Sequence, residues 1–238
     1  MYLTRFRFNT ARTRARQLLA RPQAMHAGVM CCFGDLTAPS PPGGPRPLWR
    51  VDRKSRSEVH MYLVSPERPD LTHLVEQAGW PATDAGWQTR EYAPFLARLQ
   101  EGGTWAFRLT ANPVHSVRRK DGEPTKRTAH ITPRHQIDWL LKRQENAGFE
   151  IMKGESGSGA WQPQDAWQVS VGDQRHLDFS KQAGAGERRR RVTLTTVVFD
   201  GRLRVTDPDA LRRTLTAGLG KAKAYGCGLM TLAPTNLE

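Results

Sequence analysis

The residue best suited to acid–base catalysis in this sequence is His26, in the segment PQAMHAG. A histidine titrates near neutral pH, so it can take a proton from a reacting oxygen or give one to it. A single histidine is nevertheless more often structural or exposed than catalytic. No Ser/His/Asp or Cys/His triad can be assembled from the sequence order. The residues alone therefore make His26 a candidate general base or acid and leave its substrate open.

Metal ligands are not predicted. Cys31 and Cys32 are adjacent and lack the spacer of a zinc knuckle, and Cys227 has no second cysteine nearby. His130 and His135 flank a proline with no carboxylate partner in their segment. We expect no metal and no cofactor, and we interpret the cysteines as small buried hydrophobic residues.

A glycine-rich segment, GLGKAKAYGCG at 218–228, has the composition of a phosphate-binding loop. It is not a Walker A loop, which needs glycine at Leu215 and Ser or Thr at Ala222, and Lys223 occupies the third glycine position of a dinucleotide pattern. What remains is a run of backbone amides with the ammonium groups of Lys221 and Lys223, which can hold an anion. The alternative is a tight connection between a helix and a strand.

The chain has 36 Lys and Arg against 23 Asp and Glu, a formal net charge of +13, and 28 of the basic residues are arginines. Arginine suits forked phosphate contacts, although solubility or a GC-rich genome would produce the same excess. The basic stretches at 118–120 and 188–191 flank expected hairpins. The second adjoins the segment AGAG at 183–186, which favours a flexible arm for a nucleic-acid groove over a solvated charged face.

The length of 238 residues predicts one or two domains. No apolar run approaches the ~20 residues that span a bilayer, and the opening segment MYLTRFRFNTARTRAR has no apolar core of a secretory signal. Three cysteines, an odd number, suit a reducing compartment better than a disulfide framework. We therefore expect a soluble cytoplasmic protein with no membrane partner.

The first half of the chain predicts the element order β-α-β-β-α-β. An alternating strand opens it, a helix capped by Thr10 and closed by Pro22 follows, and the Pro/Gly-rich segment 37–47 is a loop. Two apolar runs joined by the charged turn RKSRS predict a hairpin, before a helix and a closing strand. The expected elements are 2–8, 11–21, 48–52, 59–65, 71–78 and 88–93.

The second half repeats this order. It begins with a strand over 105–117, and Pro133 starts a helix that Gly148 ends. Short strands follow within 149–181, and Asp200-Gly201, a favoured type I′ turn dipeptide, predicts a hairpin between VTLTTVVF and RLRV. Asp207 caps a helix through 215, and CGLMTLAP is the last strand.

Two split βαβ units in tandem are the ferredoxin-like arrangement. We predict an α+β chain of two ferredoxin-like, RRM-like domains with βαββαβ order. The first domain is expected over 1–94 with His26, a linker over 95–103, and the second domain over 104–238 with a basic hairpin and the glycine-rich loop.

Several segments together resemble a known family, CasE, the CRISPR repeat-RNA processing endoribonuclease of the type I-E Cascade complex. The resemblance runs in order along nearly the whole chain, and FRLTANP and the terminal glycine-rich run are its most specific parts. The matching segments are MYLTRFRFN, PQAMHAG, FRLTANP, HQIDWLLKR, VVFDGRLRVTDP and GLGKAKAYGCGLMTLAP.

The resemblance implies metal-independent cutting at the stem base of the repeat hairpin in precursor CRISPR RNA. The mature guide RNA then stays bound, and a monomer joins other Cascade subunits. His26 stands at the position of the family histidine, Gln23 where many relatives have a tyrosine, and Ala27 where relatives can carry a basic residue. RNA supplies its own nucleophile, the 2′-OH, so His26 would act as base on that oxygen or as acid on the leaving oxygen, giving a 2′,3′-cyclic phosphate.

A thin basic hairpin is expected to approach the narrow, deep major groove of the RNA stem. Lys221 and Lys223 are candidates for backbone contacts, whereas Arg5 and Arg7 on the first strand can face solvent. The candidates for the hairpin are Arg175, Lys181, Arg188, Arg189, Arg190 and Arg191.

Two alternatives compete with a cutting enzyme. The first is an RNA-hairpin-binding Cascade subunit with weak or no cleavage, motivated by Gln23 in the tyrosine position. The second is a plain protein of two RRM-like domains, which is weakened because no RNP1 pattern occurs in the sequence.

Overall fold

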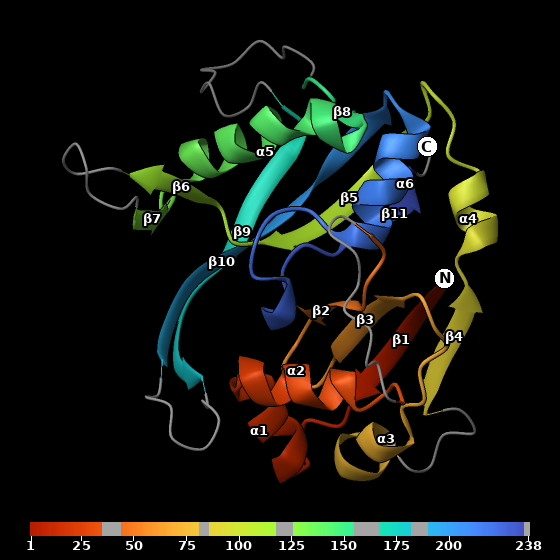
Figure 1. Ribbon diagram of the computed structural model, residues 1–238, viewed down its shortest axis with the longest axis vertical. Helices are drawn as coiled ribbons and strands as arrows, with labels where there is room; N and C mark the ends of the chain where they lie inside the picture. Colours follow the sequence, from red (N-terminus) through yellow and green to blue (C-terminus); the bar gives the residue numbers. More distant parts are fainter. Residues whose placement is uncertain (35–43, 81–85, 118–125, 155–166, 182–189, 236–238) are drawn as a thin grey trace. The chain divides into compact units, whose positions relative to one another are not determined.

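The computed structural model describes residues 1–34, 44–80, 86–117, 126–154, 167–181 and 190–235 (Figure 1). They form two compact units. The first unit comprises Met1–Arg98 and Leu215–Leu229, and the second comprises Leu99–Thr214 and Met230–Glu238. No helix in the described part of the chain is both long and apolar enough to cross a membrane.

The first unit contains a four-stranded antiparallel sheet in the order β2-β3-β1-β4. Helices α1, α2 and α3 lie on one side of this sheet (Figure 1). With β1-α-β2-β3-α-β4 connectivity, this strand order is the ferredoxin-like fold that the element order predicts. The bounds are β1 Tyr2–Phe8, α1 Thr13–Ala20, α2 Pro22–Met30, β2 Leu48–Arg53, β3 Val59–Ser65, α3 Thr72–Ala78, β4 Trp87–Glu91 and α4 Ala93–Ala97.

Alternation in β1 decides which side chains enter the core. Phe6 and Phe8 are fully buried, with ring centroids 4.9 Å apart and edge-on, while Arg5 and Arg7 are exposed. Successive side chains of a strand point to opposite faces, so one face of β1 packs under the helices and the other meets solvent. Arg5 donates to Gln88 on β4 at 2.9 Å on that outer face.

The first helix, α1, ends at Ala20, just before Pro22, as predicted. The sequence analysis did not predict that Pro22 also begins a second helix, α2, which carries His26. A proline fits the first turn of a helix because its fixed φ is already helical and its missing N–H has no partner to lose. The predicted cap of α1 at Thr10 is wrong, because Arg12 occupies the N-cap position and makes no side-chain capping hydrogen bond.

The second unit contains a sheet in the order β11-β5-β10-β8, with β9 paired to β10. This repeats the ferredoxin-like order, and α5 packs on it through Trp139, whose ring stacks on Phe199 at 6.1 Å. Gly148 ends α5 in the left-handed conformation, and Asp207 Oδ1 accepts from the amide of Ala210 at 3.0 Å, as predicted. The bounds are β5 Thr104–Ala111, β6 Val114–Val117, β7 Lys126–Ala129, α5 Pro133–Ala147, β8 Phe149–Ile151, β9 Val169–Lys181, β10 Arg190–Val205, α6 Pro208–Ala217, the 3-10 helix η2 Lys223–Tyr225 and β11 Met230–Pro234.

The hairpin predicted at Asp200-Gly201 is wrong, because β10 runs through both residues without turning. Asp200 pairs in register with Arg108 of β5, and their side chains form an ion pair at 2.6 Å. A Cβ at Gly201 would lie 2.3 Å from the carbonyl oxygen of Gln168. The glycine therefore serves a close backbone approach inside a strand rather than a turn.

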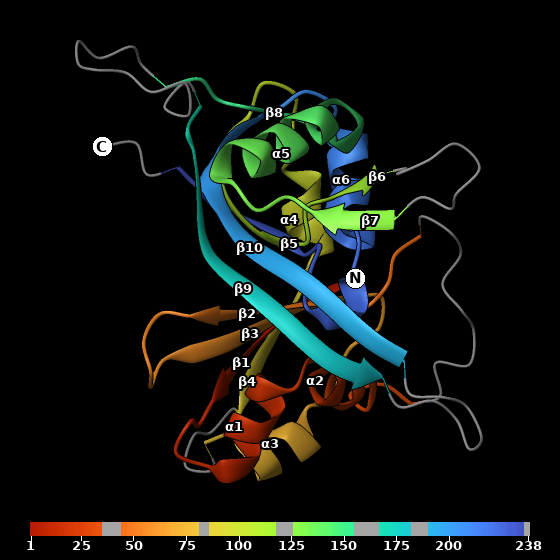
Figure 2. The same cartoon turned by 90° about the vertical axis from the view of Figure 1, so that its left-hand side faces the viewer.

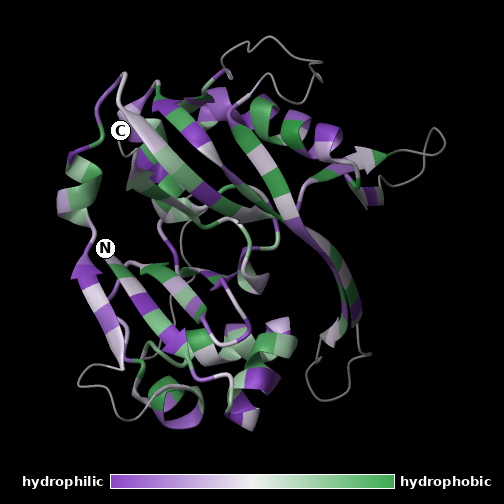
Figure 3. Cartoon of the chain, turned by 180° about the vertical axis from the view of Figure 1, so that it is seen from behind, coloured by the Kyte–Doolittle hydropathy of each residue, from purple (hydrophilic) through white to green (hydrophobic). Residues whose placement is uncertain are grey.

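The strand expected over 105–117 is two strands. β5 ends at Ala111, and β6 begins at Val114 and pairs with β7 in a separate two-stranded sheet. Pro113 between them has no N–H for a ladder, so the chain leaves the large sheet there. Figure 3 shows alternating hydrophobic and hydrophilic residues along the strands of each unit.

The segment Leu215–Leu229, which includes the glycine-rich run, belongs to the first unit, although chain order assigns it to the second domain. The difference arises because this segment packs on β2, far earlier in the sequence. The domain limits at 94 and 104 stay a prediction.

Candidate functional site

His26 lies in the middle of α2, partly exposed, between the buried residue Met25 and the exposed Ala27. Residues three apart on a helix share a face, so Gln23 lies one turn away on the same side. With Met25 and Val29 buried in the core, the helix presents His26 at the edge of its buried face.

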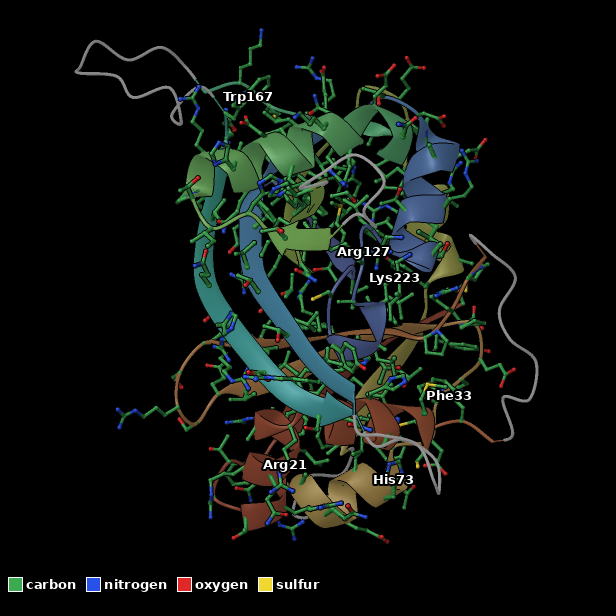
Figure 4. All side chains as sticks on the ribbon, turned by 60° about the vertical axis from the view of Figure 1, so that its left-hand side comes forward. Arg21, Phe33, His73, Arg127, Trp167 and Lys223 are labelled. Atoms are coloured by element: carbon green, nitrogen blue, oxygen red, sulfur yellow. The ribbon has the colours of Figure 1, made fainter. Side chains whose placement is uncertain are left out.

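Two contacts from another element fix α2. The His73 ring nitrogen Nε2, on α3, lies 3.0 Å from the carbonyl oxygen of Gly28. The amide of Asp70, just before α3, donates to the Cys32 carbonyl at 2.8 Å. Figure 4 labels His73 on α3 and Arg21 at the start of α2. The helix that carries His26 is therefore held in its last turn and just beyond its C-terminal end.

The glycine-rich segment packs beside this helix, because η2 contacts α2. Gly226 has φ +80°, and a Cβ there would lie 2.7 Å from the Trp49 ring. Gly218 has φ +79°, and its Cβ would lie 2.8 Å from Leu48. These glycines allow the segment to lie directly on β2, which supports the structural interpretation of the glycine pattern.

A buried ion pair ties β2 to the end of this segment. The side chain of Arg50 is 2% exposed, donates to both carboxylate oxygens of Asp52 at 2.7 and 2.9 Å, and reaches the Leu229 carbonyl at 3.2 Å. Its guanidinium also lies 5.4 Å from the ring centre of Tyr62. Sequence reasoning missed this pair. The available signal was an Arg and an Asp two apart within the apolar strand LWRVD, where they share a face.

The two lysines of the glycine-rich segment differ in their surroundings. Lys223 is partly buried and its Nζ donates to the Ala217 carbonyl at 2.6 Å, at the end of α6 (Figure 4). Burial, and then the positive charges of Arg46 and Lys221, lower the pKa of Lys223. Lys221 is exposed. Three cations, Arg46, Lys221 and Lys223, therefore lie in or next to this segment. Lys223 also caps the C-terminal end of α6.

The two strands on either side of the predicted basic hairpin, β9 and β10, pair in the second unit. Beyond Val197, where β5 ends its pairing, β10 pairs with β9 alone, so residues 175–181 and 190–196 form a two-stranded ribbon past the large sheet (Figure 2). A bulge at the base of the ribbon places Asp173 at φ +46°. A two-stranded β-ribbon is one of the elements that can enter the major groove of a DNA duplex.

Acidic neighbours hold two of the predicted arginines on this ribbon. Arg175 pairs with Asp173 at 2.8 Å, and Arg191 makes a forked ion pair with Asp178. The Arg191 hydrogen bond is the largest cause that lowers the pKa of Asp178, so that carboxylate stays charged. Arg191 is 77% exposed despite the pair.

The remaining predicted residues of the hairpin lie at or beyond the end of the described ribbon. Lys181 and Arg190 face each other in the backbone ladder at the end of the described ribbon. Arg188 and Arg189 lie outside the described residues. Among the described residues, no group of three or more His, Cys, Asp or Glu side chains could hold a metal ion.

The structure thus brings the helix of His26 beside the segment of Lys221 and Lys223 within the first unit. The ribbon arginines belong to the second unit.

Comparison with known proteins places this architecture in a family. A family model described as CRISPR associated protein matches residues 1–234. The CRISPR-associated endoribonuclease Cse3 of Thermus thermophilus is 30% identical over 235 residues, covering 98% of this chain and 100% of that protein. The chain belongs to the CasE (Cse3) family of CRISPR-associated proteins.

Other CasE-family proteins support the same assignment. The CRISPR system Cascade subunit CasE of Escherichia coli is 28% identical over 198 residues, covering 79% of this chain and 88% of that protein. A solved structure of Thermus thermophilus Cse3 bound to an RNA representing a pre-cleavage complex matches with a TM-score of 0.72 at 30% identity. That match covers 98% of both chains. The predicted family and the predicted α+β ferredoxin-like fold are confirmed.

Proposed function

We propose that this CasE-family protein is an endoribonuclease that processes precursor CRISPR RNA. The observation that carries the proposal is the full-length match, at 30% identity, to a protein named a CRISPR-associated endoribonuclease. The placement of His26 on a helix fixed from α3 and adjoining a cationic segment supports it.

The proposed reaction uses the 2′-OH beside the scissile phosphate as nucleophile and needs no metal. The 2′-oxygen forms a bond to phosphorus while the bond from phosphorus to the 5′-oxygen breaks, and a proton moves from the first oxygen to the second. His26 would transfer that proton at one of the two oxygens. The products are a 2′,3′-cyclic phosphate and a 5′-OH.

The cations would have separate tasks. Exposed Lys221 would stabilise negative charge on the phosphoryl oxygens. Lys223 would hold the same segment in place through its hydrogen bond to the Ala217 carbonyl. The ribbon of β9 and β10 would hold the stem of the repeat hairpin by its phosphates. Retention of the product, assembly of a monomer with other Cascade subunits and a cytoplasmic location belong to the same proposal.

A second candidate function rests on Gln23. A glutamine amide forms hydrogen bonds but has no ionisable proton, unlike the phenol of tyrosine, so it cannot replace the tyrosine of relatives as a proton donor. A CasE-family subunit that binds the hairpin with little or no cleavage would follow.

Cleavage of the cognate repeat RNA in EDTA separates these functions. The unmodified chain should cut in EDTA, and the product should carry a cyclic phosphate. His26→Ala should lose cleavage by about 10²–10⁴-fold, the usual contribution of a general acid or base, while it still binds RNA. His60→Gln, a histidine of β3 in the same unit, is the matched control and should cut normally.

Three results would contradict the proposed chemistry. They are a requirement for Mg²⁺, a linear phosphate as the first product, and full activity of His26→Ala. Tight binding without cutting by the unmodified chain would select the binding subunit.

A further inference from the structure

Three histidines that the proposed reaction does not use gather in the second unit. His115 lies on β6, His130 directly after β7 and His135 in the first turn of α5. The ring centroids of His115 and His130 are 4.4 Å apart, and those of His130 and His135 are 5.9 Å apart. These three residues form a histidine cluster.

The local fold explains the gathering. β6 and β7 pair so that Val114 faces Ala129, and the amide of His130 donates to the Pro113 carbonyl at 2.9 Å. The helix that follows then places His135 in its first turn, where its Nδ1 lies 2.8 Å from the Thr132 hydroxyl. Three separate segments thus converge on one point.

Basic groups surround the cluster. Burial is the largest cause that lowers the pKa of His130, followed by the charges of His115, His135, Lys142 and Arg143. Arg143 is fixed over the Trp139 ring at 4.2 Å. When one imidazole is protonated, its positive charge is repelled by the neighbouring positive charges, and a bound anion would reduce that repulsion.

The charged groups on the packed elements leave this positive character in place. α5 contributes Arg134, Asp138 and Glu145 besides Lys142 and Arg143, and β7 contributes exposed Arg127. The acidic residues of β9, which packs on α5, are engaged elsewhere: Asp173 with Arg175 and Asp178 with Arg191.

The cluster is open to a ligand. His115 and His135 are exposed, and the neighbouring Ile131 is 68% exposed. A protonated imidazole donates from both ring nitrogens and so suits the unesterified oxygens of a phosphodiester.

We propose that the histidine cluster is a further RNA-contact site, which binds backbone phosphate in its protonated form. RNA affinity then rises as the pH falls through the titration of the cluster. This inference rests on the proposed function in taking RNA as the ligand, and it adds a site on a different unit from that of His26.

The first test measures affinity for the repeat RNA in EDTA between pH 8.0 and pH 5.5. All proteins carry His26→Ala so that cutting does not disturb binding. Affinity of this background should rise about tenfold as the pH falls, the factor that one unit of pKa change confers. The added triple substitution His115→Gln, His130→Gln and His135→Gln should remove most of the rise and leave affinity at pH 8.0 unchanged. The control His60→Gln should keep the rise.

The second test reads the site directly in the unsubstituted chain. Imidazole NMR titrations should show the pKa values of the three histidines rising by about one unit when RNA is added, because binding and protonation are linked. This readout does not depend on the folding of a variant.

The outcomes are distinguishable from failure of the proposed function. If the unmodified chain cuts RNA but the triple variant keeps the pH dependence, or RNA leaves the three imidazoles unchanged, the cluster inference is overturned and the endoribonuclease stands. Absence of RNA binding at every pH overturns both. A response of the imidazoles to another Cascade subunit but not to RNA overturns the inference and marks a protein interface.

Discussion

At the residue scale, Arg50 and His26 have opposite roles in the first unit. Arg50 is buried, holds Asp52 through two hydrogen bonds and reaches the glycine-rich segment, so its task is to maintain structure. His26, the proposed acid or base, is partly exposed on helix α2. Because one side chain positions the segment beside the helix of the other, damage to Arg50 should lower activity through structure.

Arg50→Met should lower the free energy of unfolding by about 3–5 kcal/mol, because it leaves the Asp52 carboxylate buried without its partner. Urea denaturation measures the loss. The double substitution Arg50→Met, Asp52→Leu should recover much of it, and Arg5→Met, at an exposed hydrogen bond to Gln88, should change little. Equal losses in the single and double variants would contradict the role of an uncompensated charge.

The three cysteines should react at different rates with a thiol reagent. Burial raises the pKa of Cys32 and of Cys227 to about 12, whereas Cys31 is exposed. The thiolate is the reactive form, so the folded chain should label rapidly at Cys31 and slowly at the other two. Mass spectrometry of the labelled chain checks this, and Cys31→Ser should abolish the rapid phase. The expectation of buried cysteines is thus confirmed for two of the three residues.

Protonation of His130 should weaken the fold in acid. Burial lowers the pKa of His130 below the value of about 6.5 that it has in an unfolded chain, so the folded state binds fewer protons in that range. Its contribution to stability is therefore complete above pH 6.5 and is lost as the pH falls below that value. In the absence of RNA, the urea midpoint should fall less between pH 7 and pH 5 for His130→Gln than for the unmodified chain. An identical fall would contradict the shift.

At the scale of elements, β2 organises the first unit, since it pairs with β3 and supports the glycine-rich segment. Leu48, Trp49 and Arg50 each contact that segment. The contacts explain why the glycines at 218 and 226 are needed, and they place the segment beside α2. A change in this packing should therefore reach both stability and catalysis.

Gly226→Ala should be more damaging than Gly102→Ala. Both glycines have a left-handed φ near +80°, which costs about 1–2 kcal/mol for an alanine. Only Gly226 would also drive a Cβ into the Trp49 ring, whereas nothing lies within 4 Å at Gly102. Thermal unfolding and cleavage rates of the two variants isolate the effect of packing. Equal losses would show that the contact with Trp49 does not matter.

For the molecule as a whole, a net charge of +13 favours binding of a polyanion such as RNA. On the ribbon, acidic residues offset part of that positive charge. Asp178 holds Arg191 in a forked pair, so a phosphate must compete with that carboxylate. The ribbon therefore attracts phosphate through its arginines, while Asp178 holds the Arg191 side chain in place.

Arg191→Ala should weaken RNA binding and reduce the slope of log affinity against log salt by about one, since one phosphate contact is lost. Asp178→Ala should have the opposite effect on affinity, because it frees Arg191 and removes a negative charge. Fluorescence anisotropy across a salt series measures both. An unchanged slope in Arg191→Ala would exclude that arginine as a phosphate contact.

Local sequence patterns were enough to predict the two ferredoxin-like repeats and the family, but they did not predict the start of α2 at Pro22, the split between β5 and β6 or the continuity of β10. Strand alternation in β1, Pro133 and Gly148 at the ends of α5, and the Asp207 cap are local signals, and local signals survive without tertiary context. His26 also stood out, because its chemistry depends on its residue type.

Three other features could be seen only in the folded structure. It showed that Gly201 lies inside a strand, because the glycine makes room for the carbonyl of Gln168, just before β9. It showed that the glycine-rich segment packs in the first unit and that Arg50 is buried against it. Both depend on contacts between residues about 180 positions apart. It also assembled the histidine cluster from three segments. Each feature depends on which distant residues meet in space, and a one-dimensional pattern does not carry that information.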